Sequence, residues 1–184
     1  MALYSGALKR DSDMMEHYHQ MLIELTGTSI VSGYPLFRLD RVDMETAIED
    51  MRKVMPFWNV ATEYADIIVP PYYDPSRRQG SIEKLEAMYA RGDLRLATYW
   101  NALIHLYETD RAVNMAFGVF DQGVLNPVMF WSPEAGRLEF RSHPRFIELV
   151  EYIGLASYWD EVGWPMFCEP RGDSHFCGLE YRVE

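Results

Sequence analysis

The stretch RSHPRFIELVEYIGLASYWDEVGWPMFC, residues 141–168, predicts two short helices followed by a run of aromatic side chains. Ser142 or His143 can cap a helix that begins at Pro144, because a proline at the first helical position loses no hydrogen bond. Gly154 then ends this helix. The apolar positions between these ends recur at helical spacing and are Phe146, Leu149, Val150 and Ile153.

A second, shorter helix follows in the same stretch. Ser157 can cap it, and it contains Tyr158 and Trp159 before Gly163 ends it. Two adjacent helices, one with an apolar stripe and one with aromatic side chains, fit the last pair of a larger helical array. We therefore expect residues 141–184 to be the closing helix pair and tail, with the aromatic side chains covering the end of the array.

The same helical periodicity recurs upstream. It covers residues 12–25, 43–55, 81–92, 94–108 and 111–123. Ser12, Asp43 and Ser81 stand where N-caps are needed, and Gly27, Gly92 and Gly123 stand where helices stop. The apolar stripes include Met44, Ala47, Ile48, Met51, Val54 and Met55, then Ile82, Leu85, Met88 and Tyr89, then Leu96, Ala97, Trp100, Leu103, Ile104 and Tyr107, then Ala112, Val113, Ala116, Phe117 and Phe120.

The spacing of these helices indicates a repeat. Helices that begin near residues 12, 43, 81, 111 and 144 are about 31, 38, 30 and 33 residues apart, close to the period of tetratricopeptide repeats. Each is preceded by another helical stretch, at 2–10, 29–41, 59–69, 94–108 and a short one at 124–131. One helix pair cannot bury its apolar stripe alone, so stacked pairs form a continuous core. A helical bundle without repeats is the alternative.

Evidence for strands is thin. ADIIVPPYY (residues 65–73) and GRLEFRS (residues 136–142) can each extend for a few residues, but prolines bound the first of them. The sequence contains no Asn-Gly or Asp-Gly turn between two alternating runs. We therefore predict an all-α fold in a single domain, residues 1–184.

RSHPRFIELVEYIGL, then YW, then GWPMFC, resemble the closing segment of tetratricopeptide-repeat (TPR) arrays in bacterial multidomain regulators. In those proteins the array follows a winged-helix DNA-binding domain or a nucleotide cyclase domain. His143 stands where the family pattern has Asp, which changes the cap but not the expected fold. The resemblance implies a TPR-like α–α superhelix and an accessory, non-enzymatic domain for protein or peptide interaction or for sensing. Neither of those two domains is recognisable in this sequence, so neither activity carries over.

Charge and hydropathy exclude some partners. The 17 Lys and Arg residues against 28 Asp and Glu residues give a net charge of −11, which does not favour binding to nucleic acid phosphates. No apolar run approaches the ~18 residues that a membrane-spanning helix needs, and no signal peptide is visible at the N-terminus. The compartment then depends on the parent protein and is the bacterial cytoplasm or periplasm.

Motifs for catalysis or for cofactors are not found in the sequence. It has no HExxH zinc motif, no glycine-rich phosphate loop and no GxSxG motif, so we expect neither an enzyme nor a cofactor. Cys168 and Cys177 are the two cysteines, and they form either a disulfide or two free thiols. A zinc site with His175 is a third interpretation, but it needs a fourth ligand. A disulfide here closes a loop of about ten residues and stabilises the fold by ~2.5–3 kcal/mol in the chain-entropy model.

The first helix of each pair lines the concave face of such an array, so its side chains outside the core are the candidate contacts for a bound polypeptide. These candidates are Tyr34 and Arg38 in residues 29–41, and Arg95 and Tyr99 in residues 94–108. Arg and Tyr are favoured at interfaces because they combine a large contact area with directed hydrogen bonds. The alternative function is a small-molecule-binding or enzymatic helical domain with a pocket between helices.

Overall fold

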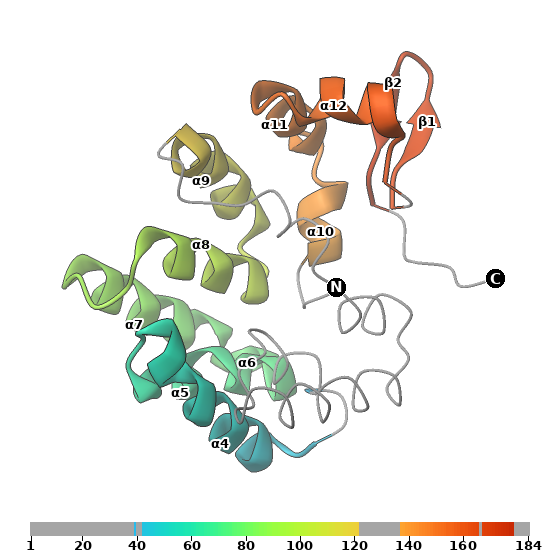
Figure 1. Ribbon diagram of the computed structural model, residues 1–184. Coiled ribbons are helices and arrows are strands. Elements are labelled where there is room, and N and C mark those ends of the chain that lie inside the picture. The colour runs from blue at the N-terminus through green and yellow to red at the C-terminus, as the bar shows by residue number, and fades with distance from the viewer. Residues whose placement is uncertain (1–38, 40–41, 122–136, 166, 179–184) are drawn as a thin grey trace, which may run out of the picture. The chain divides into compact units, whose positions relative to one another are not determined.

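A computed structural model of the chain describes residue 39 and residues 42–121, 137–165 and 167–178. These residues are mostly helical, with one small two-stranded sheet (Figure 1). The helical class is therefore confirmed, although the sheet means that the fold is not purely α. The chain divides into two compact units, residues 1–102 and 103–184, which are described in turn.

The described part of the N-terminal unit contains short helical elements between longer helices. Its described elements are α4 (Met44–Val54), η1 (Met55–Trp58), η2 (Thr62–Tyr64), α5 (Ala65–Ile68), α6 (Pro70–Tyr73), η3 (Pro75–Arg77), α7 (Arg78–Ala90) and the first part of α8 (Leu96–His105). Both α5 and α6 contact α4 and α7. The segment ADIIVPPYY is thus helical rather than extended. Its prolines are tolerated because Pro70 and Pro71 occupy the first positions of α6, where a missing N–H loses no hydrogen bond.

Helix α4 has the boundaries and the buried side that its sequence predicts. The Asp43 carboxylate accepts the Thr46 amide N–H at 2.9 Å and so caps the helix. Ala47, Met51 and Val54 are buried, as the stripe predicts. The chain that enters this helix is held by the Tyr73 hydroxyl of α6, which lies 2.7 Å from the Leu39 carbonyl oxygen and 2.8 Å from that of Val42.

Helix α7 begins three residues before its predicted cap. Ser81 is not an N-cap: it lies buried inside the helix. The reason is that Asp74 caps η3 by accepting the Ser76 amide N–H at 3.1 Å, and η3 continues directly into α7. The predicted end of the helix at Gly92 is correct. Gly92 adopts a left-handed conformation (φ +82°), and its N–H bonds to the Tyr89 carbonyl.

In its described residues, the C-terminal unit contains the end of α8, four further helices and the sheet. Its described elements are α9 (Thr109–Asp121), α10 (Arg137–Ser142), α11 (Phe146–Tyr152), α12 (Leu155–Val162), β1 (Glu169–Arg171) and β2 (Ser174–Phe176). Helix α9 contacts α10 and α11, and α11 also contacts α10 and α12. The segment GRLEFRS, which was a candidate strand, supplies α10. Its Phe140 ring is fully buried and packs edge-on against Phe146 of α11.

In residues 141–168, both helices start at other residues than the sequence predicted. Helix α11 begins at Phe146 rather than Pro144, and the His143 ring accepts the Arg145 amide N–H through Nδ1 at 3.1 Å. Ser142 does not cap, since its hydroxyl donates to the Leu138 carbonyl within α10. Ser157 does not cap α12 either, because the helix starts directly after Gly154 and Ser157 lies within it.

The sheet is an antiparallel hairpin that the sequence analysis missed. β1 and β2 are joined through Gly172 and Asp173, and Gly172 supplies the left-handed conformation of the turn (φ +61°). The pairing is short, with Glu169 opposite Phe176 at one end and Arg171 opposite Ser174 at the other.

The spacing of the helices is close to a TPR period. Helices α4, α7, α9 and α11 begin at Met44, Arg78, Thr109 and Phe146, which are 34, 31 and 37 residues apart. A TPR-like superhelix also requires a particular stacking of successive pairs, and that finer architecture stays a prediction. The helices expected at 2–10, 12–25 and 124–131 lie outside the described residues, as does the one at 29–41 apart from Leu39.

Candidate functional site

Two of the four predicted contact residues can be placed. Arg95 is exposed at the start of α8, as expected. Tyr99 is only 5% exposed, so the expectation that it turns away from the core is wrong. Its ring stacks on that of Tyr89 of α7, with centroids 4.3 Å apart and an interplanar angle of 6°. Tyr34 and Arg38 lie outside the described residues.

Two other tyrosines, which periodicity assigned to the buried stripes of their helices, are both exposed. Tyr89 belongs to the predicted apolar stripe of its helix but is 37% exposed. Tyr107, expected in the core of the next helix, is exposed to the same extent because the helix has already ended at His105. It adopts φ +59°, which is uncommon for a residue other than glycine. The prediction for Tyr107 was wrong because it continued the helical periodicity beyond the end of α8.

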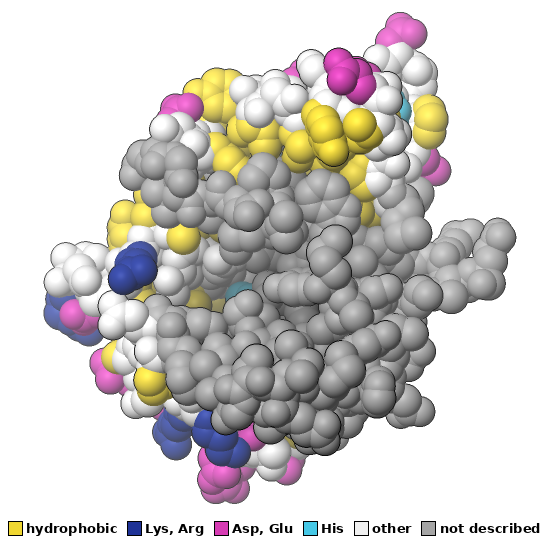
Figure 2. Space-filling model, viewed as in Figure 1, with side chains coloured by type: hydrophobic (Ala, Val, Ile, Leu, Met, Phe, Trp, Pro, Cys, Tyr) yellow, Lys and Arg dark blue, Asp and Glu magenta, His cyan; other side chains and the backbone are white. Residues whose placement is uncertain are grey.

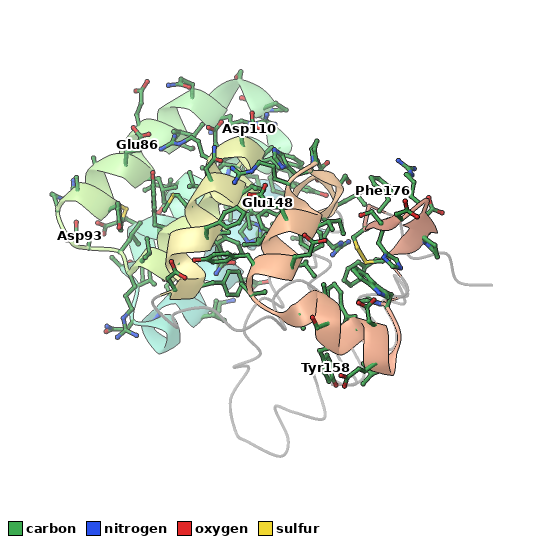
Figure 3. The ribbon with its side chains drawn as sticks, turned by 90° about the horizontal axis from the view of Figure 1, so that it is seen from above. Glu86, Asp93, Asp110, Glu148, Tyr158 and Phe176 are labelled. Atoms are coloured by element: carbon green, nitrogen blue, oxygen red, sulfur yellow. A yellow bond between two sulfur atoms is a disulfide. The ribbon has the colours of Figure 1, made fainter. Side chains whose placement is uncertain are left out.

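The connection between α7 and α8 brings charged and aromatic side chains together. We call Tyr89, Arg91, Asp93, Arg95 and Tyr99 the α7–α8 corner. Arg91 and Asp93 form an ion pair at 2.8 Å, and Figure 3 shows Asp93 at the outer edge of this connection. The Tyr99 amide N–H bonds to the Arg95 carbonyl at 3.0 Å, so these two residues lie one turn apart on the same side of the helix. The corner thus contains an exposed arginine one turn before Tyr99, whose ring stacks on the partly exposed ring of Tyr89.

The second group of predicted residues lies at the hairpin. A disulfide joins Cys168 and Cys177 and brackets the two strands. The His175 ring stacks on Trp164 at 3.6 Å between centroids. Within the residues that the structure describes, no group of three or more His, Cys, Asp or Glu side chains is placed to hold a metal ion.

An aromatic cluster connects this hairpin to α12. Trp164 packs edge-on against Trp159, and Trp159 packs edge-on against Phe167. Trp159 and Phe167 are buried, and the Arg141 guanidinium of α10 lies 4.7 Å above the Phe167 ring. Of the two aromatic side chains predicted on the second short helix, Trp159 is buried and Tyr158 is not. That such side chains cover the end of an array stays a prediction. Tyr158 is exposed on α12, as Figure 3 shows.

A row of polar contacts joins α9 to α11 and to the residues just before α11. The His143 ring meets the Asp110 carboxylate through Nε2 at 2.9 Å, and the Tyr152 hydroxyl donates to Asp121 at 2.7 Å. The Asp121 hydrogen bond raises the pKa of Tyr152 above its ordinary value. A histidine–carboxylate pair can serve in catalysis, but here both ring nitrogens of His143 are engaged and Asp110 is largely in water. The row is therefore best explained as packing between the two helices.

Arg145 is the centre of this row. Its guanidinium binds both oxygens of Glu148 at 2.8 and 3.0 Å, reaches Asn114 of α9 and lies 4.7 Å above the Phe117 ring. The hydrogen bonds between them lower the pKa of Glu148 and raise the pKa of Arg145. Figure 3 shows Glu148 on α11 near the adjacent helix.

Helices α11 and α12 have an acidic and partly apolar surface. They contain four carboxylates and no Lys, Arg or His: Glu148, Glu151, Asp160 and Glu161. Figure 2 shows hydrophobic side chains at the surface of this region, and the exposed ones include Tyr152, Tyr158 and Val162. In the described part of the chain, no helix is both long and apolar enough to span a bilayer.

Comparison of the chain with protein-family models, with curated proteins and with solved structures found no match.

Proposed function

We propose that this chain is a non-enzymatic interaction domain that binds a segment of another polypeptide, as an accessory part of a bacterial regulatory protein. We also propose that its helix pairs stack into a TPR-like superhelix. The near-34-residue spacing of helix starts and the resemblance of residues 141–168 to the end of TPR arrays support both statements.

The α7–α8 corner is the surface that we assign to binding. The observation that carries this assignment is the Tyr89–Tyr99 stack beside the exposed Arg95. Tyr99 is fixed in the core and holds the Tyr89 ring in one orientation while part of that ring stays in water. A pre-oriented aromatic ring loses little conformational entropy when a partner packs on it, and a nearby guanidinium adds directed hydrogen bonds to a backbone carbonyl or carboxylate. Tyr89 therefore replaces Tyr99 as the expected aromatic contact.

The test first identifies the bound segment. The full chain carrying Arg91→p-benzoylphenylalanine, which keeps Arg95 in place, is irradiated in an extract of its source cells. The crosslinked peptide is identified by mass spectrometry. That peptide is then synthesised and titrated against the wild-type chain, the Arg95→Ala variant and a Lys84→Ala control. Lys84 is an exposed cation on α7 outside the corner, so the control removes the same charge elsewhere.

We expect Arg95→Ala to weaken binding about tenfold, the effect of losing one interface anchor of ~1.4 kcal/mol, and Lys84→Ala to change it less than about twofold. A folded Arg95→Ala variant that binds the peptide as tightly as the wild type would show that the corner is not the binding surface. A crosslinked small molecule in place of a peptide would contradict the interaction function itself.

A further inference from the structure

The hairpin at residues 169–176 has little to hold it together by itself. It consists of three residue pairs, and Pro170 in β1 has no N–H to donate to its partner His175. At the surface, the Arg171 guanidinium of β1 lies 4.4 Å above the Phe176 ring of β2, and within β1 it lies 3.6 Å from Glu169. Isolated two-stranded hairpins are marginally stable in water, and exposed ion pairs add little.

The disulfide closes this hairpin at its base. Cys168 directly precedes β1 and Cys177 directly follows β2, so the bond joins the two ends of the hairpin and encloses both strands and the turn. Cys177 is 1% exposed, whereas Cys168 is half-buried. Closing the loop removes conformations from the open chain, which favours the paired strands over the separated ones.

The closed hairpin in turn covers the aromatic cluster that anchors α12. The His175 ring lies flat on Trp164 at 3.6 Å, and Trp164 packs on Trp159. Trp159 is the buried side chain of α12, and it also packs against Phe167, which immediately precedes Cys168. Trp164 and Phe167, which both contact Trp159, thus belong to the segment that leads into the hairpin.

We propose that the Cys168–Cys177 disulfide is a redox-sensitive latch: its reduction releases the hairpin and uncovers Trp164 and Trp159 on α12. The reductant is a dithiol. One of its thiolates attacks Sγ of Cys168, the less buried cysteine, and forms a mixed disulfide while Cys177 leaves as a thiolate. The second thiol of the reductant resolves the mixed disulfide. The protein gains two electrons and two protons, and the dithiol becomes a cyclic disulfide.

The consequence is local, because α9 is held by other contacts. It packs on α10 and α11 and is tied to α11 by the Asp110–His143 and Asp121–Tyr152 hydrogen bonds. The segments that open are therefore α12 and the hairpin, while α9 keeps its protection. This inference does not depend on the proposed binding function of the α7–α8 corner.

The test compares the oxidised full chain with the same chain in dithiothreitol, by hydrogen exchange with mass spectrometry and by tryptophan fluorescence. Reduction is expected to speed amide exchange in residues 155–176 by up to about 100-fold, the loop-closure factor of the chain-entropy model for ten residues. The emission maximum should shift to the red as Trp164 and Trp159 enter water. Residues 109–121 of α9 should exchange at an unchanged rate.

A double variant, Cys168→Ser with Cys177→Ser, supplies the matched control. It should show the fast exchange without reductant and no response when dithiothreitol is added. Equal exchange of residues 155–176 in the oxidised and reduced chains would overturn the latch. So would faster exchange throughout α9, which would make the disulfide a general support of the unit. Two alkylatable thiols in protein prepared under oxidising conditions would overturn it as well.

Discussion

Tyr73 supplies a sharp test of how the chain is tied down before α4. Its hydroxyl lies 2.7 Å from the Leu39 carbonyl oxygen and 2.8 Å from the Val42 carbonyl oxygen. A tyrosine hydroxyl has one hydrogen, so the two carbonyls share a single donor. The expected loss in a Tyr73→Phe variant is therefore about 1–1.5 kcal/mol, that of one net hydrogen bond, rather than twice that value.

The assay is urea denaturation followed by circular dichroism at 222 nm, with thermal unfolding as a second measurement. A loss of about 1–1.5 kcal/mol lowers the melting temperature of a chain of this size by roughly 2–6 °C. Tyr158→Phe is the matched control, because it removes the same atom from an exposed tyrosine and should cost less than about 0.5 kcal/mol. Amide exchange at the start of α4 should be faster only in the Tyr73 variant.

Equal urea midpoints for the Tyr73→Phe and Tyr158→Phe variants would refute the reasoning. That result would mean that water replaces the hydroxyl at both carbonyl oxygens without loss. A loss well above 2 kcal/mol would also contradict it, since one shared donor cannot account for that much. A loss of that size would mean that the substitution also changes the position of the aromatic ring.

Three further predictions concern helix ends, the aromatic cluster and pH. Gly92→Ala should lower the free energy of unfolding by about 1 kcal/mol, because φ at this position is +82°. Gly80→Ala should raise it by about 0.5–1 kcal/mol, because Gly80 lies inside α7 with open space at the Cβ position. Urea denaturation measures both changes. Trp159→Ala should cost about 3–5 kcal/mol or unfold the C-terminal unit, and circular dichroism with urea denaturation decides whether the loss is that large. The pKa of Glu148 is below its ordinary 4.5 because Arg145 binds the charged form, so its stabilising effect is present above pH 4.5 and disappears as pH falls through the lowered pKa. The difference in melting temperature between the wild type and Glu148→Gln should therefore shrink from pH 6 to pH 3, and a constant difference would contradict this.

The helices of this chain were predictable wherever a cap, an apolar stripe and a stop agree. Asp43, the stripe through Met51 and the end near Pro56 locate α4 almost to the residue. Agreement of this kind is local, because each signal acts within one or two turns of the backbone. Where one signal was isolated, it misled: Ser81 looks like a cap, but Asp74 starts the helical path seven residues earlier.

The candidate site was harder to predict than the helices. Periodicity placed Arg95 correctly at the surface, but it exposed Tyr99 and buried Tyr107, and both assignments were wrong. Burial of Tyr99 depends on Tyr89 of another helix, and a stack between helices leaves no periodic signal in either one. The hairpin at the disulfide was missed because its strands have three residues each, too few to show alternation.

Helices α7 and α8 end in the same backbone motif. After α7, the Gly92 N–H bonds to the Tyr89 carbonyl and the Asp93 N–H bonds to the Met88 carbonyl, which is the Schellman arrangement. After α8 the same pattern recurs, with Tyr107 in the left-handed position that glycine holds after α7. Two successive helices thus end in this motif, and each is followed by a short connection to the next helix. Tyr107 holds a position at which glycine avoids the strain of a left-handed backbone, and its ring is exposed. Tyr107 is therefore the next residue to vary once a bound polypeptide is identified.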